Sequence, residues 1–339
     1  RRATDGTCLA ALVMMAVPLC RAAQRRCPRT GPGQPPAYED WQMAVLIMTA
    51  VLKKRKSKSA QYRWLYEHRR RLRNRLGLKE FPARSTYFDR YRSAHRLFQA
   101  AIQVQGEKAI DEGVADARVV AGDKSLLRAR GPIWHKSERQ RNHVPKGRHG
   151  VDRDSDFGYN NYHGWVQGYS YEVVVTATKG STVFPLLASV DRASASEHIT
   201  FKAKIDDLPP STRHVLADAG YDNNRFGDRV EYDEHGRRTG RHWICPLQPR
   251  AHVAKPGRPR AGARGQARQR RARRFAFYRS PKGRRLYARR GKSVEPFNEW
   301  FKNLFDLTER VWHHGLDNNR TQLLAAIFWN TVMTKPSVR

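Results

Sequence analysis

The chain has 339 residues, which is enough for two or three domains or for one large domain with insertions. Its 65 Lys and Arg against 31 Asp and Glu give a net charge of +34, which predicts a polyanionic partner, nucleic acid first and an anionic membrane second. The four cysteines form no CxxC pair, which argues against a zinc site or a disulfide framework and favours the reducing cytoplasm.

The first 37 residues predict an N-terminal extension that ends in a linker. The apolar run at residues 8–20 is too short to span a bilayer and contains Pro18, so it gives no support to a membrane protein. It loosely resembles a signal peptide, but no small-residue cleavage site follows, and a peripheral helix or a frame artefact fits better. The stretch RTGPGQPP after it indicates a linker.

Residues 38–110 predict a helical DNA-binding domain. Apolar residues recur at helical spacing in three stretches: 41–52, 62–76 and 85–102. A short Gly/Pro-bearing turn precedes the third stretch, which suits a helix-turn-helix motif, although an ordinary helical bundle with a solvated basic face explains the pattern equally well. The residues that such a motif would present to DNA are Arg84, Ser85, Thr86 and Arg90.

Strand-like patterns replace the helical spacing after residue 115. ARVVAGDKSLLRA carries Asp123 in the middle of an apolar strand, and YSYEVVVTAT with VFPLLASV predicts a hairpin that turns at residues 179–181. RHVLADAG and HWICPLQP add two strands, with helices expected at SEHITFKAKIDDL and over 223–233. Residues 115–335 therefore predict an α/β domain with a five-stranded mixed sheet flanked by helices.

A basic arm is expected within this domain. Residues 249–290 contain no acidic residue, so the run would repel itself and bury no core of its own. We expect a flexible or partly ordered arm that lies against phosphates. Helical patterns resume after it, in SVEPFNEWFKNLFDL and NRTQLLAAIFWNTVM.

Three carboxylates occupy comparable edges of the predicted sheet. Asp123 interrupts the first strand, Asp218 ends the fourth, and Glu295 opens the helix after the arm. A buried Asp is costly unless its charge is compensated, and Mg²⁺ or Mn²⁺ prefers carboxylate oxygens. Two such ions about 4 Å apart activate a hydroxyl nucleophile and stabilise the leaving oxygen of a phosphodiester. Three unrelated surface acids are the alternative.

Four blocks resemble, in order, the signature blocks of the DDE transposases of bacterial insertion sequences: VVAGDKSLLRARGPIWHK, DSDFGYNNYHGWVQGYSYEVVV, VLADAGYDN and YARRGKSVEPFNEWFKNLF. The last block is similar to the family's Tyr-Arg-Glu-Lys signature, but four residues separate Arg290 from Glu295 where the pattern has three. The second block ends in Ser170-Tyr171-Glu172, where Lys-Leu-His is common.

The resemblance implies a ribonuclease-H-like catalytic domain after the helical DNA-binding domain. It implies that Asp123, Asp218 and Glu295 are catalytic residues that bind Mg²⁺ or Mn²⁺, with two ions expected. The residues implied to contact transposon-end DNA are Tyr287, Arg290 and Lys302.

The implied function is that of a bacterial, nucleoid-associated transposase with no membrane partner. It would bind the inverted repeats of its element as a homodimer, hydrolyse a phosphodiester to free a 3′-hydroxyl, and transfer that strand to target DNA. A repressor derived from a transposase, which binds the repeats without cutting them, is the alternative. A basic RNA-binding or membrane-surface protein is a third interpretation.

Overall fold

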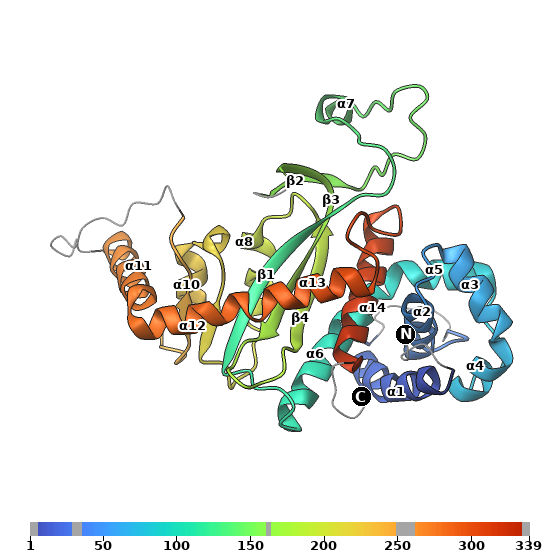
Figure 1. The fold of residues 1–339 in the computed structure, drawn as a ribbon, viewed down its shortest axis with the longest axis horizontal. Helices are drawn as coiled ribbons and strands as arrows, with labels where there is room; N and C mark the ends of the chain where they lie inside the picture. The colour runs from blue at the N-terminus through green and yellow to red at the C-terminus, as the bar shows by residue number, and fades with distance from the viewer. Residues whose placement is uncertain (1–5, 29–35, 161–163, 249–261, 334–339) are drawn as a thin grey trace.

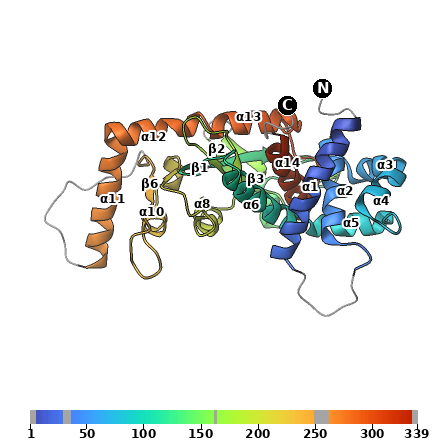
Figure 2. The ribbon, with the colours of Figure 1, turned by 90° about the horizontal axis from the view of Figure 1, so that it is seen from below.

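The computed structural model describes residues 6–28, 36–160, 164–248 and 262–333. Helices from the N-terminal half gather at one end, and a twisted sheet occupies the middle (Figure 1). Two later helices, α12 and α13, run nearly end to end across the sheet, and α11 turns sharply away from them (Figure 2). The N-terminal helices are α1 (Gly6–Arg26), α2 (Asp40–Leu52), α3 (Lys58–Glu67), α4 (Arg69–Leu76), α5 (Arg84–Ser93) and α6 (His95–Asp111).

The apolar run near the N-terminus forms a packed helix. Val13, Ala16, Cys20 and Ala23 on α1 are buried, and the helix packs against α2 and α6. This segment therefore belongs to the core, whereas the sequence indicated an extension. Across the described part of the chain, none of the helices combines the length and apolarity that crossing a bilayer requires.

The sheet contains six strands. They are β1 (Val119–Arg128), β2 (Asp156–Asn160), β3 (Gly164–Thr176), β4 (Pro185–Arg192), β5 (His214–Leu216) and β6 (His242–Ile244). The order is β2-β3-β1-β5-β6. Strand β4 pairs with the part of β3 that follows the part paired with β2. Strand β3 is antiparallel to β1, β2 and β4, and β5 is parallel to β1 and β6.

The mixed sheet that the sequence predicted is confirmed, with one strand more than expected. The sequence does not indicate strand β2, because three of the five residues of DFGYN are Asp, Gly and Asn, which strands disfavour. The helix expected at SEHITFKAKIDDL is divided into α8 (Glu197–Thr200) and α9 (Lys202–Ile205). Two further helices lie between strands of the sheet along the chain, α7 (Lys136–Gln140) and α10 (Asn224–Glu231).

The two faces of the sheet bury separate clusters. Val119 and Ala121 of β1 belong to a core shared with the N-terminal helices, whereas Val120 belongs to a second core that contains Phe201 and Trp243. Side chains alternate between the faces along a strand. Asp123 therefore lies on the first face, and Gly122 lies against the second.

Gly122 has no room for a side chain. A Cβ at this position would lie 2.3 Å from Cε2 of Phe201, a ring that is fully buried. We expect Gly122→Ala to destabilise the protein by about 1–3 kcal/mol, the usual cost of overpacking a core. Thermal unfolding of Gly122→Ala, Phe201→Leu and the double variant measures it. If replacing the ring with the smaller leucine side chain does not reduce the cost of the alanine, the clash is not its cause.

The basic arm is helical where the structure describes it. It contains α11 (Ala263–Arg279) and most of α12 (Pro281–Gly291), followed by α13 (Val294–Leu304) and α14 (Leu316–Met333). Arginines of α11 form ion pairs with acids near α10: Arg270 and Arg274 with Asp228, and Arg271 with Asp222. Repulsion among the arginines was the reason to expect a flexible arm. These acids offset that repulsion, although they lie far from the arm in the sequence.

Helix α14 lies between the sheet and the N-terminal helices. Its central residues 323–329 are buried in the core shared with the N-terminal helices and with one face of the sheet. Trp329 Nε1 donates a hydrogen bond to the Met48 carbonyl of α2 at 2.6 Å. The helical region at 38–110 and the sheet domain therefore share one continuous core.

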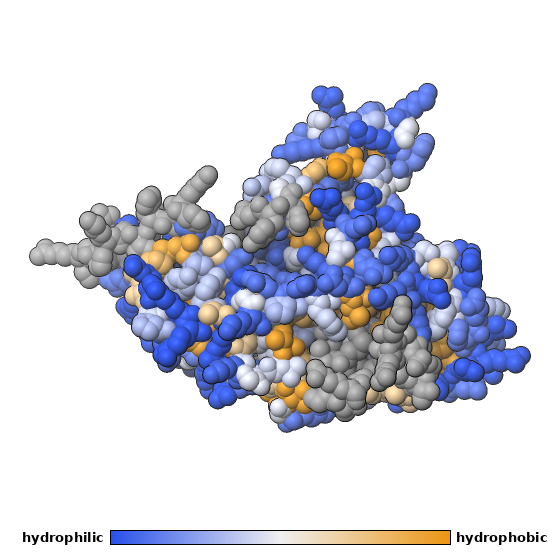
Figure 3. Space-filling model, in the orientation of Figure 1, coloured by the Kyte–Doolittle hydropathy of each residue, from blue (hydrophilic) through white to orange (hydrophobic). Residues whose placement is uncertain are grey.

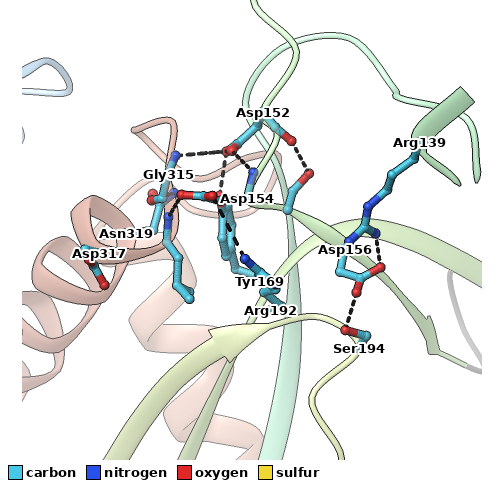
Figure 4. Close-up of polar contacts among 12 residues, drawn as sticks. Arg139, Asp152, Asp154, Asp156, Tyr169, Arg192, Ser194, Gly315, Asp317 and Asn319 are labelled. Atoms are coloured by element: carbon cyan, nitrogen blue, oxygen red, sulfur yellow. Dashed lines mark hydrogen bonds and ion pairs between the residues drawn. The ribbon is translucent and has the colours of Figure 1, made fainter. Parts of the chain in front are cut away.

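Acidic side chains of the loop before β2 cap the start of α14 (Figure 4). The Gly315 amide donates to Asp152 Oδ1 at 3.2 Å, and the Leu316 amide donates to Asp154 Oδ2 at 3.1 Å. The Tyr169 hydroxyl donates to Asp152 Oδ2 at 2.7 Å from the sheet below. These acids satisfy amide groups that a helix N-terminus leaves without partners.

Candidate active site

Two of the predicted carboxylates lie side by side at one edge of the sheet. Ala121 of β1 pairs with Leu216 of the parallel strand β5, so Asp123 and Asp218, two residues further along each chain, have equivalent places. Arg290 of α12 joins them. Its Nη2 lies 2.5 Å from Asp123 Oδ1 and 3.6 Å from Asp218 Oδ2.

Asp218 also has the local role of a turn residue. It precedes the short 3-10 turn Ala219–Tyr221, and its Oδ1 accepts a hydrogen bond from the Gly220 amide at 2.9 Å. The side chain is still 44% exposed, and its other oxygen faces Arg290. One carboxylate therefore caps the turn and contributes to the site at the same time.

Asp123 is the more buried of the two, with 15% of its side chain exposed. Burial raises the pKa of this carboxyl to about 6, and neighbouring Asp218 acts in the same direction, while Arg290 and Asn298 oppose both. A charged carboxylate in this place is favoured only if a cation stays close to it.

Asn298 of α13 is a site residue that the sequence did not indicate. Its Nδ2 donates to Asp123 Oδ2 at 2.7 Å, and its Oδ1 accepts from the Tyr171 hydroxyl at 2.9 Å. The available signal was its spacing, three residues after Glu295 on the same side of a helix. An amide is not a carboxylate, so a search for acidic residues passes over it.

The block that departs from the transposase pattern supports the same site. Tyr171 of β3 holds Asn298, while the next residue, Glu172, faces the opposite side of the sheet. Glu172 accepts from the Tyr221 hydroxyl at 2.7 Å and pairs with Lys204 at 2.5 Å. All of these side chains apart from Asn298 are buried. The buried pair therefore anchors the turn that carries Asp218.

Glu295 is not brought to the two aspartates. It lies in the first turn of α13, is exposed, and folds back toward Gly291, with its Oε1 3.4 Å from where a Cβ of that glycine would stand. No group of three or more His, Cys, Asp or Glu with metal-binding geometry occurs among the described residues. Two of the three predicted ligands are assembled, and the third lies one turn along α13 from Asn298.

The oxygen donors at this edge nevertheless suit a divalent cation. Asp123 and Asp218 share one cationic nitrogen, so both carboxylates already face a common positive charge. Hard cations prefer such carboxylate oxygens.

The other predicted DNA contacts of the last block flank the carboxylates. Tyr287 of α12 is half-buried with its ring edge against Tyr278, and burial raises its pKa to about 12. Lys302 of α13 is half-buried; burial lowers its pKa, and the charge of Asp123 opposes that shift. Lys302 follows Asn298 by four residues, so both lie on the same side of α13.

The predicted recognition helix corresponds to α5. Arg84 and Ser85 at its start are exposed, and Thr86 is half-buried. Arg84 donates to Ser59 Oγ at 3.0 Å. Arg90 is held within the protein instead, because it donates to the Tyr38 carbonyl at 2.7 Å, pairs with Asp40 at 3.0 Å and is only 15% exposed.

Comparison with known families assigns this arrangement. The model of the transposase DDE domain family matches residues 114–330. No curated protein and no solved structure matches the chain. The family match and the sheet confirm the expected ribonuclease-H-like fold. Its strands β4, β3, β1, β5 and β6 lie in that order with β3 alone antiparallel to the others, and β2 pairs with β3 next to β4. The chain belongs to the family of proteins that carry a transposase DDE domain.

Proposed function

We propose that this protein is the transposase of an insertion sequence, which binds the terminal inverted repeats, hydrolyses a phosphodiester and transfers the freed strand to target DNA. The observation that supports it best is the pair Asp123 and Asp218, one on β1 and one just after the parallel strand β5, both facing one cation. The family match covers the whole of this region.

The carboxylates of Asp123 and Asp218 hold Mg²⁺ or Mn²⁺ in this proposal, with two ions expected, and Glu295 completes the set from α13. The bound ions supply Lewis-acid activation of the nucleophile and stabilise the leaving oxygen. Asn298 orients Asp123 through a 2.7 Å hydrogen bond. Arg290 neutralises the two aspartates, and its guanidinium would also suit a phosphate of the bound DNA.

DNA contacts come from two regions in this proposal. Arg84, Ser85 and Thr86 at the start of α5 face base edges of the repeat, while Arg90 supports that helix from inside. Tyr287, Arg290 and Lys302 contact the backbone of the transposon end beside the carboxylates. The protein acts as a homodimer on DNA, since an element has two ends to be joined.

The competing function is a repressor that binds the repeats without cutting them. The separation of Glu295 from the two aspartates favours it. The test is incubation of the full chain with duplexes that carry the inverted repeats flanking its gene, with Mg²⁺, with Mn²⁺ and with chelator. A transposase nicks these duplexes only with the cation, whereas binding without nicking under all three conditions identifies the repressor.

A further inference from the structure

A second basic surface lies on α12, on a different flank from the carboxylate site. A groove of about 630 Å³ separates α12 from the turn between β3 and β4. Hydrophilic residues cover much of α12 on the face of the molecule that Figure 3 shows. The cationic residues that line the groove are Lys179, Lys282, Arg285, Arg289 and Lys292.

The charge of the groove is unbalanced. Its lining contains no acidic side chain. Within the described residues none of its five cations forms an ion pair, unlike Arg270, Arg271 and Arg274 of α11. Arg271 and Arg274 of α11 already have carboxylate partners, so their charge is compensated inside the protein. The five cations of the groove are therefore available to an outside anion.

The spacing of the helical cations matches a nucleic acid strand. Residues 282, 285, 289 and 292 fall within an arc of about 80° around α12 and span about 15 Å along it. A DNA strand has one phosphate for about every 3.4 Å of duplex axis. Four or five phosphates of one strand therefore cover the same length as the cations.

The groove is also close to the carboxylates. Thr176, which lines it, stands three residues beyond Val173, the strand partner of Asp123. Three residues of strand measure about 10 Å. A duplex whose strand enters the active site reaches the groove within a few base pairs.

We propose that this groove binds the sugar-phosphate backbone of the DNA duplex being cut, beside the active site and without reading bases. The inference rests on the proposed function in that the polyanion is DNA. Within the basic arm, it assigns the phosphate contacts to α12 and excludes the paired arginines of α11. Lys179 of the β3–β4 turn adds a contact from outside the arm.

The test compares two triple variants of the full chain that lose the same charge. The groove variant carries Lys179→Gln, Lys282→Gln and Arg285→Gln, and the control carries Lys202→Gln, Arg225→Gln and Arg284→Gln. The control residues are exposed and lie outside the groove. Arg284, the neighbour of Arg285, points about 120° away from the centre of the cation arc. Affinity for a repeat duplex and for a random duplex is measured over a series of salt concentrations.

In the groove variant, the slope of log K against log salt concentration should become less negative by roughly 2.7, which is about 0.9 for each of the three lost phosphate contacts. The change should be the same on both duplexes, and the control should change the slope by less than about 1. Equal slopes for groove variant and control overturn the inference, as does an effect confined to the repeat duplex. Metal-dependent nicking by the unmodified chain is measured in parallel. A lack of nicking refutes the proposed function, whereas the slopes of log K against log salt show independently whether the groove binds DNA.

Discussion

Asp123→Asn is expected to reduce metal-dependent DNA cleavage by more than about 100-fold. Replacing a residue that only orients a metal ligand costs up to about 100-fold, and replacing a ligand itself should cost more. An amide is a poor ligand for a hard cation, and Asp123 is the buried member of the pair. Asp218→Asn should have the same effect. Affinity for duplex DNA should hardly change, because the substitution alters a net charge of +34 by one unit. Nicking assays and binding titrations on the same preparations measure both.

The matched control is Asp207→Asn, which changes the charge equally at an exposed position. It should cut DNA like the unmodified chain. Circular dichroism and thermal unfolding test whether Asp123→Asn is folded. We expect it to fold, because Asp218, 3.6 Å from the Arg290 guanidinium, keeps a carboxylate near that charge. Cleavage at an undiminished rate by a folded Asp123→Asn chain would show that the carboxylate pair is not the catalytic centre.

Glu295→Gln should remove cleavage to a similar extent, whereas Glu299→Gln should cost much less. Both acids are exposed on α13, but they differ in direction. Asn298, which contacts Asp123, lies about 60° around the helix from Glu295 and about 100° from Glu299. A change of side-chain rotamer therefore brings Glu295 toward Asp123 more easily. Cleavage is measured for both variants at saturating Mg²⁺ and again with Mn²⁺. An active Glu295→Gln chain beside an inactive Glu299→Gln chain would reverse the assignment.

The parts of the fold that depend on local pattern were predictable from the sequence. The apolar run around Asp123 and the run before Asp218 each predict a buried strand, and both are present as β1 and β5. Their parallel pairing places the two aspartates together. The edge strand β2 was not predictable in this way, because pairing with β3 stabilises it in spite of its composition.

The parts that depend on distant partners were not predictable. The arm is helical because Asp222 and Asp228 pair with its arginines, and nothing in the arm itself indicates those partners. Asn298 joins the site because α13 crosses the sheet with that residue above Asp123, a placement set by the packing of Phe297 and Phe301 in the core. The approach of Glu295 to the aspartates remains a prediction.

The place of α14 in the core sets the order in which the protein is completed during synthesis. Helices α1, α2 and α6 cannot close their core until residues 323–329 of α14 have been added. At translation rates of about 5–20 residues per second, on the order of 15 s or more passes between the exit of α1 and that of α14. The nascent N-terminal helices therefore wait with exposed apolar faces, and a chain released before α14 would be a substrate for proteases rather than a competitor for the DNA.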